Sequence, residues 1–164
     1  MSSISGKLHF LMCRLFHRFV FTEGALMYSI TNFNYHLLEK WKFGGRLCYF
    51  FEMQIKKLLF DCRECGDCSL FDLAYLCPMS KCAKFQRNGP CGGSKEGMCE
   101  ADNTKRCVWT LVYERLSSIN KLDNIRYEYI PPIDHSLSHT SSWANFFMGR
   151  DHTSKKLKEK KGEN

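Results

Sequence analysis

Eight of the ten cysteines of this chain lie within one stretch, residues 62–107. The spacing is C-x2-C-x2-C-x8-C-x4-C-x8-C-x7-C-x7-C, over Cys62, Cys65, Cys68, Cys77, Cys82, Cys91, Cys99 and Cys107. Glycine and proline interrupt the stretch throughout, which predicts irregular loops rather than long helices or strands. So many thiols in a loop-rich segment indicate a region held together by metal ions or by disulfides.

The amino-terminal residues favour metal ions over disulfides. The apolar run over residues 8–21 is interrupted by Arg14, His17 and Arg18 and is followed by no small-residue cleavage site, unlike a signal peptide. The chain has no stretch of roughly 18 apolar residues, so we expect no transmembrane segment. We therefore expect a cytoplasmic protein, whose clustered thiols bind metal. Four disulfides in a secreted domain are the alternative.

The opening C-x2-C-x2-C run is the most specific part of the array. Bacterial ferredoxins use this run for a [4Fe-4S] cluster, whose remote fourth thiolate is often followed by proline, as Cys77 is by Pro78. Eight thiolates suffice for two [4Fe-4S] clusters, although the spacing does not assign each cysteine to a cluster. Structural zinc is the alternative, but zinc ribbons prefer two separate C-x2-C knuckles.

The net charge of +7 over 164 residues belongs to the two ends of the chain. The cysteine region is nearly neutral, whereas the last eleven residues carry five lysines and two glutamates. A nucleic-acid-binding protein needs a basic stripe on its folded part, so we expect no nucleic-acid partner. A nucleic-acid-binding zinc protein remains a weaker alternative.

Apolar residues at helical spacing predict helices before and after the cysteines. Three are expected over residues 8–19, 26–41 and 46–59, with Gly44-Gly45 ending the second, and a fourth over 108–119. Such apolar helices on a small chain favour packing against a partner surface. Attachment to a membrane surface through a basic amphipathic helix is the alternative.

The predicted fold is small and mainly α, with irregular cysteine-rich loops and a metal-stabilised core. Four parts are expected: an apolar helical docking segment (1–61), the metal-binding domain (62–135), an aromatic and histidine-rich segment (136–153) and a disordered basic tail (154–164). Cys13 and Cys48 are expected to be buried small hydrophobes. An Asp151-His152 functional pair is a minor hypothesis.

Several motifs together resemble a known family. These are Cys65-Gly66-Asp67-Cys68, the string from Leu76 to Lys84, Arg87 to Gly93, Gly97-x-Cys99-Glu100 and Cys107-Val108-Trp109 with Tyr113 to Leu116. They resemble the C-terminal domain family of methylenetetrahydrofolate reductase, the MetV-like proteins, over about residues 59–135. The segment from Ser141 to His152 looks like the tail of the longer, fused members.

The resemblance implies a non-flavin component of a methylenetetrahydrofolate reductase system. Such a component is not catalytic alone: it carries metal at the eight cysteines and passes electrons from a donor protein to a MetF-like flavoprotein. The chain departs from that family in having neither an upstream Gly-Cys-Gly-x-Cys motif nor a reductase barrel, and a helical apolar stretch takes their place. A structural zinc-binding interaction module without a redox role is the alternative.

Overall fold

The computed structural model describes residues 3–126 and 129–162 of the chain. The described part is mainly helical, with long irregular connections in the cysteine-rich region, as the sequence predicts. Within it, no helix is both long and apolar enough to cross a membrane.

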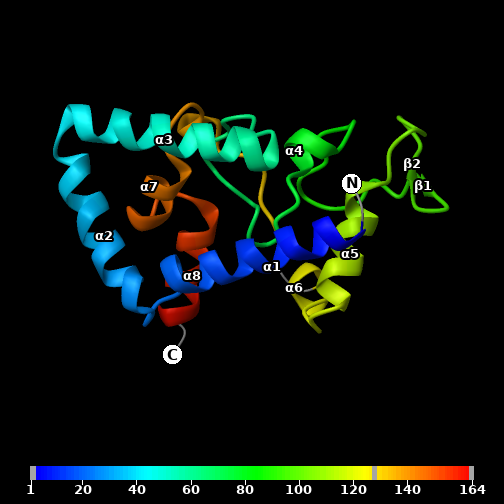
Figure 1. Ribbon diagram of the computed structural model, residues 1–164, viewed down its shortest axis with the longest axis horizontal. Helices are drawn as coiled ribbons and strands as arrows, with labels where there is room; N and C mark the ends of the chain where they lie inside the picture. Colours follow the sequence, from blue (N-terminus) through cyan, green and yellow to red (C-terminus); the bar gives the residue numbers. More distant parts are fainter. Residues whose placement is uncertain (1–2, 127–128, 163–164) are drawn as a thin grey trace.

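Three long helices form an open frame along one side of the molecule (Figure 1). They are α1 (Ser3–Val20), α2 (Leu26–Glu39) and α3 (Lys42–Phe60). Gly24, at a φ of 85°, allows the turn between α1 and α2, a backbone angle that side chains with a Cβ disfavour. Figure 1 shows α7 lying between the arms of the frame, with α8 crossing α1 in this view.

The Gly44-Gly45 pair corrects one boundary prediction. It lies inside the first turn of α3, not at the end of a helix, and both N–H groups donate to the carbonyl of Trp41. A Cβ on Gly44 would lie 3.0 Å from the backbone oxygen of Leu38. The small residue therefore permits a tight passage from α2 into α3.

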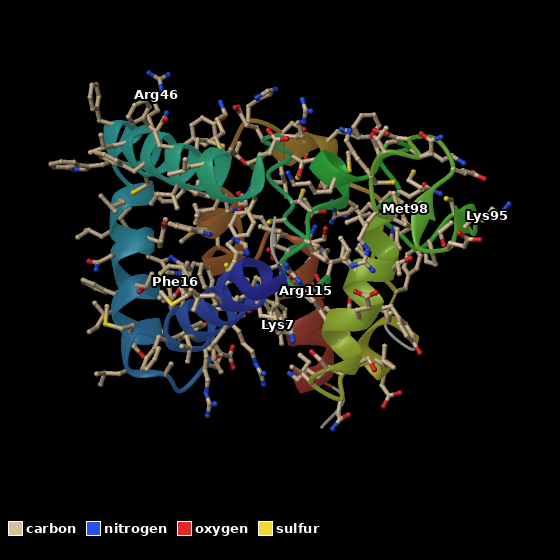
Figure 2. The ribbon with its side chains drawn as sticks, turned by 45° about the vertical axis from the view of Figure 1, so that its right-hand side comes forward. Lys7, Phe16, Arg46, Lys95, Met98 and Arg115 are labelled. Carbon is tan, nitrogen blue, oxygen red and sulfur yellow. The ribbon has the colours of Figure 1, made fainter. Side chains whose placement is uncertain are left out.

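The cysteine-rich region follows α3 and contains little regular structure. Its elements are α4 (Pro78–Lys81) and a two-stranded antiparallel hairpin, β1 (Ser94–Lys95) and β2 (Met98–Cys99). Helix α5 (Val108–Ser117) follows, as expected, and then α6 (Asp123–Arg126). The hairpin, marked by Lys95 and Met98, lies at the opposite end of the molecule from Arg46 of α3 (Figure 2).

Helix α5 carries the apolar core under the cysteine-rich loops. Residues from three segments pack together there: Leu73, Ala74, Val108, Trp109, Val112, Leu116 and Ile130. Arg115 of the same helix donates to the carbonyl of Ala74 at 3.0 Å and lies over the ring of Phe10 at 5.5 Å. Figure 2 shows this arginine where α1 approaches α5, so it joins the frame to the core.

The carboxyl-terminal part comprises the 3-10 helix η1 (His135–Leu137), α7 (Ser142–Phe147) and α8 (His152–Gly162). The rings of α7 pack on the frame: Phe147 stacks on Phe21 at 5.4 Å and on Tyr35 at 5.2 Å. Trp143 lies 6.0 Å from both Phe16 and Phe21. The predicted aromatic segment is thus the inner surface on which α1 and α2 rest.

The sequence predicts disorder from Ser154, but the structure describes a helix there, α8, as far as Gly162. Asp151 accepts from the backbone N–H of Ser154 at 2.8 Å and so caps α8, whose first turn is buried. This cap and the burial outweigh the unfavourable run of lysines that follows. Residues 163–164 of the predicted tail lie outside the described residues.

Candidate metal centre

All ten cysteines are free thiols. Four members of the array gather in one place at the end of α3: Cys62, Cys65, Cys68 and Cys77. The thiols of Cys68, Cys77 and Cys62 each lie close enough to Cys65 to affect its ionisation. The C-x2-C-x2-C run and the cysteine before Pro78 therefore lie in the same region of the structure.

The local backbone makes this gathering possible. Asp61 ends α3 in the left-handed conformation at a φ of 54°, and Glu64 and Gly66 have φ values of 57° and 69°. These left-handed angles break any helical or extended run of the chain within the loop. The N–H of Glu64 donates to the sulfur of Cys62 at 3.5 Å, and the Cys65 thiol donates to the carbonyl of Asp67 at 3.7 Å.

The glycine in this loop is required by a close backbone contact. A Cβ on Gly66 would lie 1.8 Å from the carbonyl oxygen of Leu137, which no backbone tolerates. The positive φ of Gly66 independently disfavours a side chain. The loop between Cys65 and Cys68 is therefore pressed against the segment that follows Asp134.

Burial governs the protonation of these thiols. It raises the pKa of Cys65 to about 12, with further increases from the neighbouring Cys68 and Cys77 sulfurs. Burial likewise raises the pKa of Cys62 and of Cys77, although N–H and hydroxyl donors of Met79 and Ser80 oppose it at Cys77. Thiolates close together repel one another, and a bound cation removes that repulsion.

Two buried cations lie near the four thiols. Lys56 is 4% exposed. Burial lowers its pKa, but the nearby Cys68 and Glu52 raise it more, so that its pKa lies above the usual value. Arg87 is 2% exposed and lowers the pKa of Cys65 against the effect of burial. Positive charge from these two side chains would offset the negative charge of a thiolate-bound metal centre.

The remaining four cysteines surround the hairpin and the start of α5. Cys82 and Cys107 pack against the same apolar core. Cys91 and Cys107 line one cavity of about 410 Å³, and the thiols of Cys91 and Cys99 both act on Lys84. The N–H of Cys107 donates to the carbonyl of Gly97 in the hairpin turn at 2.8 Å. This second group is more open than the first, and Cys91 is exposed.

Neither group is a closed metal site as it stands. Within residues 3–126 and 129–162, no three His, Cys, Asp or Glu side chains meet in an arrangement that could hold a metal ion. The metal-stabilised core expected from the sequence therefore stays a prediction. The donor sets fit soft metals, because thiolates are the ligands preferred by iron–sulfur clusters and by zinc.

A buried ionic network lies beside the first group and was not predicted from the sequence. Asp67, between Cys65 and Cys68, is 1% exposed and accepts from Arg87 Nη2 at 2.8 Å and from His152 Nδ1 at 2.6 Å. The other ring nitrogen of His152 lies 3.0 Å from Asp72. Burial opposes ionisation of Asp67, but the bonds and charges of His152 and Arg87 hold its pKa well below the usual range.

The segment after Asp134 covers the same loop with further hydrogen bonds. The N–H of His139 donates to the carbonyl of Glu64 at 2.9 Å, and Asn145 Nδ2 donates to that of Gly66 at 3.0 Å. His152 thus pairs with Asp67 and Asp72, whereas Asp151 serves as the cap of α8. The signal for this network was present in the Cys65-Gly66-Asp67-Cys68 and Asp151-His152 strings.

The two cysteines outside the array are not buried as expected. Cys13 and Cys48 are each partly exposed, and burial raises the pKa of both thiols. Cys13 lies 3.7 Å from His9 on the same face of α1. Neither thiol takes part in the two groups of four described above.

The model of one protein family, described as methylene-tetrahydrofolate reductase C terminal, matches residues 45–136. The match covers more than half of the chain and includes all eight clustered cysteines. The chain belongs to this family. Searches of curated proteins and of solved structures give no match.

Membership of the methylene-tetrahydrofolate reductase C-terminal family confirms the resemblance seen in the sequence. It relates the chain to methylene-tetrahydrofolate reductase systems. The matched region begins within α3 and ends at η1, so α1, α2, α7 and α8 lie outside it. His152, which pairs with Asp67 in the cysteine region, therefore lies beyond the family match.

Proposed function

We propose that this chain is a metal-bearing accessory component of a methylenetetrahydrofolate reductase system that passes electrons to a MetF-like flavoprotein. The observation that carries the proposal is the gathering of Cys62, Cys65, Cys68 and Cys77 at the end of α3, within a chain of this family. The chain acts with its partner and is not catalytic alone.

The proposal assigns the eight cysteines to two sites. Cys62, Cys65, Cys68 and Cys77 would hold the first metal centre, and Cys82, Cys91, Cys99 and Cys107 the second. Bound at these thiolates, [4Fe-4S] clusters would supply one-electron transfer. The chain's own groups would set the conditions: N–H donors of Glu64, Met79 and Ser80 toward sulfur, and the charges of Lys56 and Arg87 close by.

The outer surface of the frame supports a docking role for α1–α3. Large apolar side chains of these helices face solvent: Leu26 is 84% exposed, Phe43 81% and Leu58 86%. A monomeric protein seldom leaves so many apolar side chains exposed together on one side. We propose that a MetF-like flavoprotein covers this surface. The donor protein would then approach the hairpin end, where Cys91 is exposed.

Electron transfer to a flavoprotein tests the proposal. The chain is isolated without oxygen, reduced with dithionite, freed of excess reductant and mixed with an oxidised MetF-type flavoprotein. We expect bleaching of the flavin absorption with the wild-type chain and with Cys13→Ser, which lies outside the array. Cys65→Ser should slow bleaching strongly, and Leu58→Glu should weaken complex formation. Bleaching that does not depend on Cys65 would contradict the redox role.

A zinc-stapled interaction module is the competing outcome of the same experiment. The chain would then bind the flavoprotein and hold zinc without transferring electrons. A complex that forms with unchanged flavin absorption would replace the redox role with this one.

A further inference from the structure

The side chain of Arg87 has a buried donor without an acceptor among the residues that the structure describes. Arg87 Nη1 donates to the carbonyl of Asp67 at 2.9 Å, and Nη2 donates to its carboxylate at 2.8 Å. The third nitrogen, Nε, is buried and has no hydrogen-bond partner in the part of the chain that the structure describes. An unpaired buried donor costs free energy, so such a group calls for an acceptor that the folded chain alone does not supply.

A cysteine of the array and this guanidinium share one hydrogen-bond acceptor. The carbonyl oxygen of Asp67 accepts from Arg87 Nη1 and also lies 3.7 Å from the thiol of Cys65. The arginine and the cysteine sulfur therefore meet at one backbone oxygen. A metal-bound thiolate or a sulfide at this place is an acceptor of the kind that Nε lacks, and N–H bonds to sulfur stabilise such centres.

The guanidinium is held in position from the other side. Asp67 accepts from both Arg87 and His152, and His152 Nδ1 also lies 3.0 Å from Arg87 Nη2. Asp72 fixes the second ring nitrogen of His152. Because these groups are buried together, Arg87 has little freedom to turn away, and its donor is already oriented before a metal arrives.

We propose that Arg87 is a positioning residue of the first metal site, where its free Nε–H and its positive charge stabilise the sulfur of Cys65 in the metal-bound state. This inference rests on the proposed function, in which Cys62, Cys65, Cys68 and Cys77 bind metal. Arg87 would then act on the metal site without being a ligand, and His152 would hold Arg87 in place.

Cobalt(II) is the probe for the test, because it binds thiolate sites of iron and of zinc alike and its thiolate charge-transfer absorption reports on the sulfur. The full-length reduced chain is titrated with Co²⁺ without oxygen, and the binding step that is lost in Cys65→Ser identifies the first site. Arg87→Gln is expected to weaken that step by about 10- to 100-fold. Its charge-transfer absorption should also shift, a change that loss of a merely structural contact does not produce.

Three further variants distinguish the effects of the charge of Arg87, of its Nε–H donor and of its orientation. Arg87→Lys keeps the charge but loses Nε, so its Co²⁺ affinity should lie between those of the wild type and Arg87→Gln. His152→Gln keeps the arginine but loosens it, so its loss should be smaller. Arg150→Gln is the matched control, because Arg150 forms an exposed ion pair with Glu39 at 2.8 Å. It should bind Co²⁺ like the wild type.

The outcomes separate this inference from the proposed function. Wild-type Co²⁺ binding that Arg87→Gln and Arg87→Lys leave unchanged in affinity and absorption overturns the inference alone. A wild-type chain that binds no Co²⁺ at Cys65 overturns the metal site and the inference with it. Circular dichroism of each metal-free variant checks the fold, and if Arg87→Gln is unfolded, Arg87→Lys and His152→Gln decide.

Discussion

His152 donates from Nδ1 to the carboxylate of Asp67 at 2.6 Å, and the two residues are 85 positions apart in the sequence. Asp67 lies between two cysteines of the array, whereas His152 begins the last helix. This bond ties the carboxyl-terminal segment to the cysteine loop beside its thiols. The loop and the segment therefore form one structural unit, and a change in either should be felt in the other.

The stability of this unit should depend on pH through His152. Burial disfavours the imidazolium, but the bonds to Asp67 and Asp72 raise the pKa of His152 to about 9. Because the pKa of His152 is higher in the folded than in the unfolded chain, its protonated form stabilises the fold. This stabilisation is complete below the unfolded pKa of about 6.5 and is lost as the pH rises through about 9. The difference in unfolding free energy between wild type and His152→Gln should therefore be largest at low pH.

That difference should amount to roughly 3 kcal/mol near pH 6 and should shrink toward pH 10. Denaturant unfolding of both proteins across this range measures it. A difference that stays constant with pH would show that His152 is neutral in the fold.

Gly66→Ala should damage the cysteine loop severely. The added Cβ would meet the carbonyl oxygen of Leu137 at 1.8 Å, and the φ of 69° adds strain of its own. We expect a loss of about 2–4 kcal/mol in unfolding free energy. Gly45→Ala is the control, since a Cβ there meets nothing within 4 Å and lies in α3, where alanine should stabilise. Equal melting temperatures for the two variants would refute the close contact.

Glu52 should be essential for the attachment of α7 to α3. It is 1% exposed, pairs with Lys56 at 2.9 Å and accepts from the hydroxyl of Ser142 at 2.7 Å. Glu52→Gln leaves a buried lysine without its counter-ion, so we expect a loss of about 3–5 kcal/mol in denaturant unfolding. Glu39→Gln removes the exposed pair with Arg150 and should cost less than about 1 kcal/mol. Similar losses in both variants would contradict the burial of the Glu52 pair.

Metal removal should loosen the cysteine-rich region more than the helical frame. Residues 62–107 contain only α4 and a short hairpin, so thiolate–metal bonds would supply much of their order. Hydrogen exchange before and after treatment with a strong chelator should show faster exchange in this region and little change in α2. Unchanged exchange throughout would show that the loops are stable without metal.

Much of the fold follows from local sequence patterns. Apolar spacing over 8–19 and 108–119 predicts α1 and α5. Helix α5 buries its apolar face, whereas Leu8, Leu11 and Phe19 of α1 stay exposed. The start of α3 could not be predicted from local propensity. The glycine at position 44 is there because of a close contact with Leu38, which only the folded structure shows. Helix α8 was not predicted, because its cap and its buried first turn depend on tertiary contacts.

The candidate site was predictable in its thiols but not in their surroundings. The C-x2-C-x2-C spacing identifies Cys62, Cys65 and Cys68 because ligand spacing is a local property. The contributions of Arg87 and His152 depend on chain segments brought together only by folding, as does the division of the eight cysteines into two groups. The Asp151-His152 string draws attention to the histidine, but the sequence does not show that it contacts Asp67 and Arg87.

The central claim is that the clustered thiols hold metal, and metal analysis of the oxygen-free protein tests it most directly. Iron, acid-labile sulfide and zinc are measured per chain, for the wild type and for Cys65→Ser and Cys99→Ser. The account predicts about eight irons and eight sulfides in the wild type, with about half lost in each variant. A chain that contains neither iron nor zinc, or whose eight cysteines are joined in pairs as disulfides, would contradict it.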